Sequence, residues 1–305
     1  LLGISVEGKP EEQSLYFVTW DGNRVPSILP KPRFVEWDVT SARCLMAYQD
    51  SYAVFSALPN FTMEVYLKEK LENALWWNST LFVVTQSEIK CHFPNKRDKI
   101  DTVLLATFDI ATYALFANAS EEDSIDPIPQ SRPKGTITLV DIIGDNLYII
   151  DSTSSIHSLS LDYAPLKFRM LVMAKRVEHA FEWLPFIPEE LHDYLVDFLV
   201  ERGYAVEAAK HIETMSPSKR LNLCLTYKLC NEGYAALQIV DSKHVMHLSE
   251  ENLSKLYIRL ATICILQRDN DLAEKCYRRA TELHDSALKD LIAFYGRFQK
   301  QKELE

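Results

Sequence analysis

The sequence predicts a β + α fold class, with C-terminal blades of a WD-repeat β-propeller over residues 1–164 and a tetratricopeptide-like α-solenoid over residues 165–305. Three observations lead to this prediction. Short β-prone runs separated by turns fill the first range, whereas apolar residues at helical spacing fill the second. A tryptophan-containing unit also recurs in the first range at the spacing of propeller blades. The chain has 305 residues, 47% of them hydrophobic, and is therefore long enough for two domains.

The predicted β region contains a hairpin followed by three copies of one unit. Residues 15–20 are β-prone, and Asp-Gly-Asn at residues 21–23 is a strong hairpin signal before a return strand over residues 24–29. Each copy of the unit has three apolar strands joined by short polar turns, and the copies lie at residues 35–57, 74–93 and 139–161. Trp37 and Trp76 are 39 residues apart. WD-repeat blades recur at about 40 to 45 residues, so this spacing predicts blades.

Burial of both faces of each small sheet is the physical reason to expect that the blades pack together. One small antiparallel sheet cannot bury both of its faces alone, whereas blades around an axis bury them against each other. Residues 1–164 suffice for about four blades, so we expect the remaining blades from a segment before Leu1. Residues 118–134 are acidic and contain prolines, which predicts a loop inserted in or between blades. A four-stranded, sandwich-like arrangement is the alternative.

Residues 182–203 connect the two predicted architectures and carry clear helix boundaries. Pro185 and Pro188 predict a bend, because each fixes its own φ and disfavours the α-helical conformation of the residue before it. Pro188 and the two glutamates after it predict a helix start, and Gly203 predicts its end. The helix is expected to bury one face, which carries Leu191, Leu195, Phe198 and Leu199. The opposite face is expected to be exposed and carries Asp193, Asp197 and Glu201.

The rest of the second half predicts a series of short helices. They are expected at residues 166–181, 188–202, 204–213, 217–229, 235–240, 250–263 and 270–283. Residues 232–234, Glu-Gly-Tyr, are predicted to end one helix and to start the next. Small and aromatic side chains are expected where helices touch, namely Ala205, Ala208, Ala209, Ala273 and Ala280, together with Tyr257, Tyr277 and Tyr295. This pattern predicts an irregular solenoid, in which each helix pair packs mainly on its neighbours.

Composition excludes several classes of protein. The net charge of −10, from 43 acidic and 33 basic residues, argues against nucleic acid as the main partner. The best apolar run, residues 103–115, is interrupted by Asp109 and falls short of a membrane span. No signal-peptide pattern is present, although the chain begins at Leu1.

The six cysteines form no CxxC pair and no zinc-finger spacing. We interpret them as reduced core residues of a cytoplasmic protein. Four N-x-S/T sequons, at Asn60, Asn78, Asn118 and Asn252, are accordingly interpreted as chance matches.

No set of residues indicates catalysis, so the sequence predicts no catalytic, cofactor-binding or metal-binding residue and no cofactor. Neither a GxGxxG motif, a Walker motif nor a nucleophile elbow occurs. The histidines interpreted as solvated or capped surface residues are His179, His192 and His211. His244 and His247 have i,i+3 spacing, but no carboxylate or cysteine follows in a metal-binding motif. Trp76 and Trp77 are predicted to be one core residue and one surface or interface residue.

Several stretches carry a family resemblance. Residues 37–40 are WDVT, residues 44–49 are CLMAYQ, and residues 81–91, after Trp76, are LFVVTQSEIKC. In the helical half, HDYLVDFLVERGYAVEA begins at His192. This order resembles the second propeller and following solenoid of the coatomer α and β′ subunits, and it is more similar still to their relatives in the TSET/TPLATE adaptor complex.

The resemblance covers residues 1 to about 240, and its motifs are structural ones. The loop at residues 118–134 is shorter than the usual insert of the family. Residues 241–305 follow the family by architecture only.

The resemblance implies a non-enzymatic structural subunit of a membrane-trafficking coat or adaptor complex. Its partners would be other coat or adaptor subunits in a hetero-oligomer, with the propeller as a platform and the solenoid as a contact surface. The implied location is cytoplasmic, with recruitment to Golgi, endosomal or plasma membranes. Membrane contact is expected to be indirect, because this acidic chain lacks a basic patch. The cargo-binding propeller of coatomer subunits is the first one, so no cargo-binding residue is assigned here.

Two alternatives stay open. A propeller–solenoid scaffold of intraflagellar transport or of the nuclear pore would have the same architecture. A propeller-domain enzyme belongs to a different class, and a convergent set of acid, base or metal-binding residues would favour it.

Overall fold

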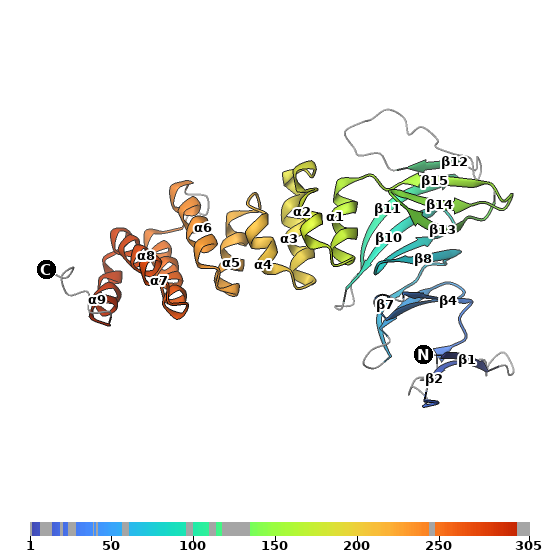
Figure 1. Ribbon diagram of the computed structural model, residues 1–305, viewed down its shortest axis with the longest axis horizontal. Helices are drawn as coiled ribbons and strands as arrows, with labels where there is room; N and C mark the ends of the chain where they lie inside the picture. Colours follow the sequence, from blue (N-terminus) through green and yellow to red (C-terminus); the bar gives the residue numbers. More distant parts are fainter. Residues whose placement is uncertain are drawn as a thin grey trace. The chain divides into compact units, whose positions relative to one another are not determined.

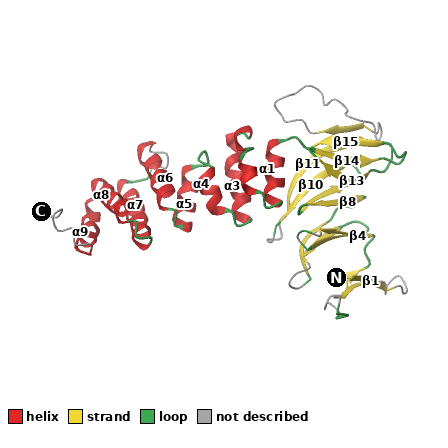
Figure 2. Ribbon diagram, viewed as in Figure 1, coloured by secondary structure: helices red, strands yellow, loops and turns green. Residues whose placement is uncertain are grey.

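The structure is a computed structural model of the chain. It describes residues 2–6, 14–18, 21–23, 29–38, 40, 42–56, 61–95, 100–109, 114–117, 135–243 and 248–297. The described strands form antiparallel sheets and end at Ser160, and the helices begin at Ala164 (Figures 1 and 2). This order confirms the mixed β + α class. A closed propeller stays a prediction. The loop predicted at residues 118–134, and His244 and His247, lie outside the described residues.

The chain divides into two compact units, Leu1–Phe186 and Ile187–Glu305, which we call the sheet unit and the helical unit. The secondary structure changes near the predicted boundary between residues 164 and 165, but the first two helices belong to the sheet unit. The domain boundary itself therefore stays a prediction.

The described part of the sheet unit contains four antiparallel sheets. The first has strands β1 (Leu2–Val6), β2 (Ser14–Val18) and β3 (Leu29–Pro30). The second has β4 (Phe34–Asp38), β5 (Arg43–Ala47), β6 (Tyr52–Ser56) and β7 (Thr62–Leu67). The third has β8 (Asn73–Trp77), β9 (Thr80–Val84), β10 (Glu88–Pro94), β11 (Ile100–Asp109) and β12 (Ala114–Ala117). The fourth has β13 (Thr138–Ile143), β14 (Asn146–Ile150) and β15 (Ile156–Ser160).

The three predicted copies of the unit are confirmed as the first three strands of the second, third and fourth sheets. Strands β1, β7, β11 and β12 were not predicted. Strand β7 lies at an edge and buries Val65 but exposes Met63 and Tyr66, so its apolar residues do not alternate as in a half-buried strand. The hairpin of β2 and β3 forms around Gly22, whose φ is +81°. Its described return strand is only Leu29–Pro30, and residues 24–28 lie outside the described ranges.

Contacts between the second and third sheets recur at sequence offsets of 39 and 40 residues. The Trp76 indole donates to the Glu36 carbonyl oxygen at 3.1 Å, a separation of 40 residues. The Thr40 and Ser79 hydroxyls lie 3.2 Å apart and are 39 residues apart in sequence. These offsets match the spacing that predicted blades. Positions of neighbouring sheets that are equivalent or one residue removed therefore contact each other, and the two sheets share one core cluster of Leu45, Ala47, Tyr52, Val54, Val65, Leu71, Ala74, Leu81 and Val83.

Trp76 packs against the core cluster shared by the second and third sheets, and both Trp76 and Trp77 are half-buried, so the expectation of one core residue and one surface or interface residue stays a prediction. Adjacent residues of a strand face opposite sides of the sheet, and here each side is partly covered. The third sheet also contacts the fourth, where the Leu139 amide donates to Asn73 Oδ1 at 2.8 Å.

Helices α1 (Ala164–Met173) and α2 (Val177–Phe181) complete the sheet unit. The sequence predicted one helical run here, but Lys175 has a φ of +61° and interrupts it. Arg169 of α1 pairs with Asp101 of β11 at 3.4 Å, and its guanidinium lies 5.3 Å from the centre of the Phe93 ring. Helix α1 is thereby attached to the third sheet.

In the helical unit, each helix contacts the next one along the chain (Figure 1). The helices are α3 (His192–Glu201), α4 (Ala205–His211), α5 (Pro217–Tyr227), α6 (Cys230–Lys243), α7 (Glu250–Leu266), α8 (Asn270–Leu283) and α9 (Leu288–Arg297). The alanines and tyrosines predicted at helix contacts are all buried, which confirms that part of the prediction. Among the helices of the described ranges, none combines the length and apolar character needed to cross a membrane.

The predicted helix break at residues 232–234 was wrong. Helix α5 ends at Lys228, whose φ is +59°, and α6 runs through Gly233 without interruption. A Cβ atom on Gly233 would lie 3.1 Å from Leu260 Cδ1 and 3.3 Å from Cys224 Cβ. Glycine is therefore placed here for close helix packing rather than as a stop.

The segment predicted to begin the helical region has the expected faces except at Leu191 and Asp193, which are both half-buried, and its α-helix begins at His192 rather than at Pro188. A 3-10 turn over Glu189–Leu191 leads into α3, which buries Leu195, Phe198 and Leu199. Gly203 ends the helix with a φ of +87°. Its amide donates to the Val200 carbonyl at 3.1 Å, and the next amide reaches back to Leu199 at 2.9 Å, which is a Schellman motif.

Replacing Gly203 with alanine should lower the stability of the helical unit by about 1 kcal/mol, because a Cβ atom disfavours its left-handed backbone. Gly203→Asn should cost less, since asparagine tolerates this region better. The measurement is urea denaturation followed by far-UV circular dichroism. Gly296→Ala is the matched control, because Gly296 lies in α9 with open space around its Cα. Equal losses at both glycines would contradict the prediction.

Candidate functional site

The structure places one of the three predicted surface histidines in the core. His192 is buried, and its ring contacts the Thr214 hydroxyl and, at 3.0 Å, the Ile187 carbonyl oxygen. The surface interpretation of His192 was therefore wrong. Its partner Thr214 lies 22 residues away, so no local sequence signal indicates the contact. His179 and His211 are exposed, as predicted.

The six cysteines are free and buried, which confirms that they are core residues without disulfides. Burial raises the pKa of the Cys44 thiol to about 12 and that of the Cys224 thiol to about 11. Both thiols stay protonated near neutral pH, and a thiol is a poor nucleophile in that form. In the described ranges, no group of three or more His, Cys, Asp or Glu side chains is arranged to hold a metal ion.

A buried histidine joins two sheets of the sheet unit. His92 of β10 lies 2.8 Å from the Tyr52 hydroxyl of β6 and 2.8 Å from the Thr102 hydroxyl of β11. Burial, with a smaller effect of the Lys90 charge, lowers the pKa of His92 to about 3. Both ring nitrogens are occupied by protein partners, so His92 is a structural residue that stays neutral at physiological pH.

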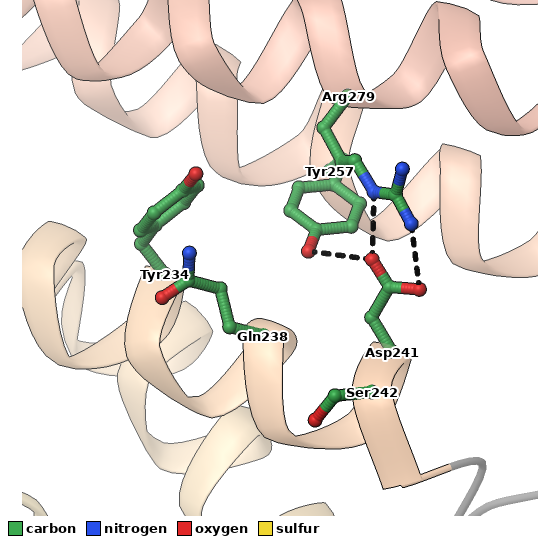
Figure 3. Close-up of a pocket in the computed structure, with 6 residues that line it drawn as sticks. All are labelled: Tyr234, Gln238, Asp241, Ser242, Tyr257 and Arg279. Carbon is green, nitrogen blue, oxygen red and sulfur yellow. Dashed lines mark hydrogen bonds and ion pairs between the residues drawn. The ribbon is translucent and has the colours of Figure 1, made fainter.

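A concave site in the helical unit is the strongest candidate for binding. It is a cavity of about 430 Å³ formed by α6, α7 and α8, and its lining residues are Tyr234, Gln238, Asp241, Ser242, Tyr257 and Arg279 (Figure 3). Four of them come from α6 with sequence spacings of 4, 3 and 1, which place them along one side of a helix. Tyr257 of α7 and Arg279 of α8 form the opposite wall (Figure 3).

An ion pair fixes the base of this pocket. Arg279 Nε donates to Asp241 Oδ2 at 2.7 Å, and Nη2 donates to Asp241 Oδ1 at 3.0 Å. The Tyr257 hydroxyl adds a third bond to Asp241 Oδ2, at 3.3 Å. Arg279 Nη1 also donates to Glu282 Oε2 at 2.8 Å. The Asp241 carboxylate is therefore compensated by its neighbours, and the pair joins α6 to α8.

The protonation states in the pocket follow from these contacts. Hydrogen bonds to Asp241 and Glu282 raise the pKa of Arg279, which stays charged. Burial, together with the Asp241 charge, raises the pKa of Tyr257, so its hydroxyl stays a donor. The pocket therefore presents hydrogen-bonding side chains beside an ion pair whose two charges hold each other.

Sequence reasoning did not identify this pocket. Tyr257 was predicted only as a helix contact, which its burial confirms. Arg279 and Asp241 are 38 residues apart, and their pairing depends on how α6 and α8 pack. The only local signal was the i,i+4 spacing of Tyr234 and Gln238 on α6.

Comparison with known proteins identifies one informative relative. No protein-family model matches the chain. The chain is 24% identical over 308 residues to a Dictyostelium discoideum protein named TSET complex member tstF. The match covers 94% of this chain but only 27% of that protein, so the chain spans about a quarter of its relative. The chain is thus similar along almost its whole length to part of a protein named as a TSET complex member.

Proposed function

We propose that this chain is part of a non-enzymatic structural subunit of a TSET-type coat or adaptor complex in membrane trafficking. The observation that carries the proposal is the similarity to TSET complex member tstF over 94% of the chain, which spans both units rather than one common domain. The order of antiparallel sheets followed by stacked helices supports the same assignment.

In this proposal the four sheets are blades of a WD-repeat propeller, and the helical unit is a solenoid that presents a surface to other subunits. The 39- or 40-residue offset between contacts of the second and third sheets supports the blade interpretation. Partners are other coat or adaptor subunits in a hetero-oligomer. The protein is cytoplasmic, and those partners recruit it to Golgi, endosomal or plasma membranes. Nucleic acid is not among its partners in this proposal.

Affinity purification of the tagged full-length protein from its own cells, followed by mass spectrometry, tests this proposal. We expect adaptor-type small and medium subunits to co-purify, and fractionation should find the protein both in the cytosol and on membranes. Recovery of ciliary transport proteins or nuclear-envelope proteins in their place would overturn the coat assignment and favour another propeller–solenoid assembly.

A further inference from the structure

The pocket between α6, α7 and α8 has no uncompensated charge at its base. Both oxygens of Asp241 are bonded to Arg279, whose guanidinium is also shared with Glu282 at the exposed rim. A cationic ligand would compete with Arg279 for the carboxylate, and an anionic ligand would face the carboxylate itself. Either would have to disrupt a half-buried ion pair, which is unfavourable. The electrostatics therefore favour an uncharged ligand.

The wall of the pocket nearest the solvent carries polar groups available for a ligand. Neither the Gln238 amide nor the Tyr234 hydroxyl hydrogen-bonds to another described residue. Ser242 donates its proton to the Ile239 carbonyl at 3.3 Å, which leaves its oxygen as an acceptor. A primary amide presents a donor and an acceptor side by side, and this pattern is complementary to the C=O and N–H of a peptide unit.

The dimensions of the site match a short stretch of chain. Tyr234 and Ser242 are eight positions apart on α6, about 12 Å along the helix. About three or four residues of extended polypeptide have the same length. The cavity, about 430 Å³, is also within the usual range of ligand sites. The half-buried Tyr234 ring, which packs edge to face at 6.3 Å on the buried Tyr257 ring, provides apolar surface for one side chain of such a segment.

We propose that this pocket binds an extended, uncharged segment of a partner protein, with the Gln238 amide pairing with one of its peptide units. The Tyr234 ring contacts a neighbouring side chain of the segment. The inference rests on the proposed scaffold function for the source of the segment, which is another subunit of the same complex.

Selection from a phage-displayed library of random linear peptides tests the inference directly, with the whole 305-residue chain as bait. The Gln238→Met variant, which keeps the length of the side chain but removes its amide, serves for counter-selection. We expect enriched peptides to be uncharged, and Gln238→Met should weaken their binding about tenfold, the effect of losing two hydrogen bonds. Tyr227→Phe, an exposed tyrosine on α5 outside the pocket, is the control and should leave binding unchanged.

Three results would overturn the inference: no enrichment, enrichment of peptides rich in lysine, arginine, aspartate or glutamate, or equal binding by Gln238→Met. Gln238 is exposed, so its replacement should leave the fold intact, and unchanged circular dichroism checks this. Failure of peptide binding with normal recovery of adaptor subunits would overturn this inference alone. Intact peptide binding with recovery of ciliary or nuclear-envelope proteins would overturn only the proposed function.

Discussion

Replacing Leu195 with aspartate should unfold the N-terminal part of the helical unit and reduce recovery of partner subunits. Leu195 has 0% exposure, and it lies on the buried face of α3 with Phe198 and Leu199. Truncating a buried leucine costs about 2 to 5 kcal/mol by itself. Aspartate adds an unpaired carboxylate in an apolar environment, so the total loss should exceed about 4 kcal/mol.

The two units can be followed separately in this experiment. All five tryptophans, Trp20, Trp37, Trp76, Trp77 and Trp183, lie in the sheet unit. Tryptophan fluorescence therefore reports on the sheet unit, whereas far-UV circular dichroism is dominated by the helices. We expect Leu195→Asp to lower the helical signal and its urea midpoint while the fluorescence transition stays in place.

A matched control makes the same chemical change at the surface. Leu266, at the end of α7, is 70% exposed, so Leu266→Asp should leave both the stability and the recovery of partners close to wild type. Unchanged soluble yield, urea midpoint and co-purification of Leu195→Asp would contradict the buried-face assignment.

Lowering the pH from about 7 to about 5 should destabilise the sheet unit by about 2 kcal/mol through His92 alone. The pKa of His92 is lowered from 6.5 to about 3 in the folded state by burial. Between these two values the unfolded chain binds a proton that the folded chain rejects. Stability is therefore lost as the pH falls below about 6.5, and the loss levels off below about pH 3.

Urea denaturation followed by tryptophan fluorescence, at both pH values, measures this effect. The pH-induced change should be about 2 kcal/mol smaller in His92→Gln than in wild type, because glutamine does not titrate. His179→Gln, the same substitution at an exposed position of α2, is the control for the loss of a histidine side chain. NMR titration of the histidine rings gives a readout that does not require a stable variant, and a His92 transition near its unperturbed pKa would contradict the prediction.

The sequence predicted elements well where burial has a regular period. The three-strand units and helices such as α3 and α8 have apolar residues at strand or helix spacing, and a local pattern is enough to place them. Gly233 shows the limit of such patterns. In the sequence this glycine resembles a helix stop. In the structure it allows α6 to approach Leu260 of α7 closely, and a local sequence pattern cannot predict that contact.

The candidate site was not predictable for the same reason. Its ion pair joins Asp241 to Arg279 across 38 residues of sequence. A charged residue on a helix is normally expected to be solvated. Only the packing of α6 against α8 brings Asp241 and Arg279 together as an ion pair. Contacts between helices, rather than the helices themselves, define the pocket.

The interface between the second and third sheets has a consequence for how this region can change over time. Because Thr40 contacts Ser79 and Glu36 contacts Trp76, the interface joins positions of successive repeats that are equivalent or one residue removed. The acceptor for the Trp76 indole is a backbone carbonyl, which any residue type at position 36 supplies. Over evolution this contact therefore tolerates substitution of Glu36, whereas substitution of Trp76 removes it.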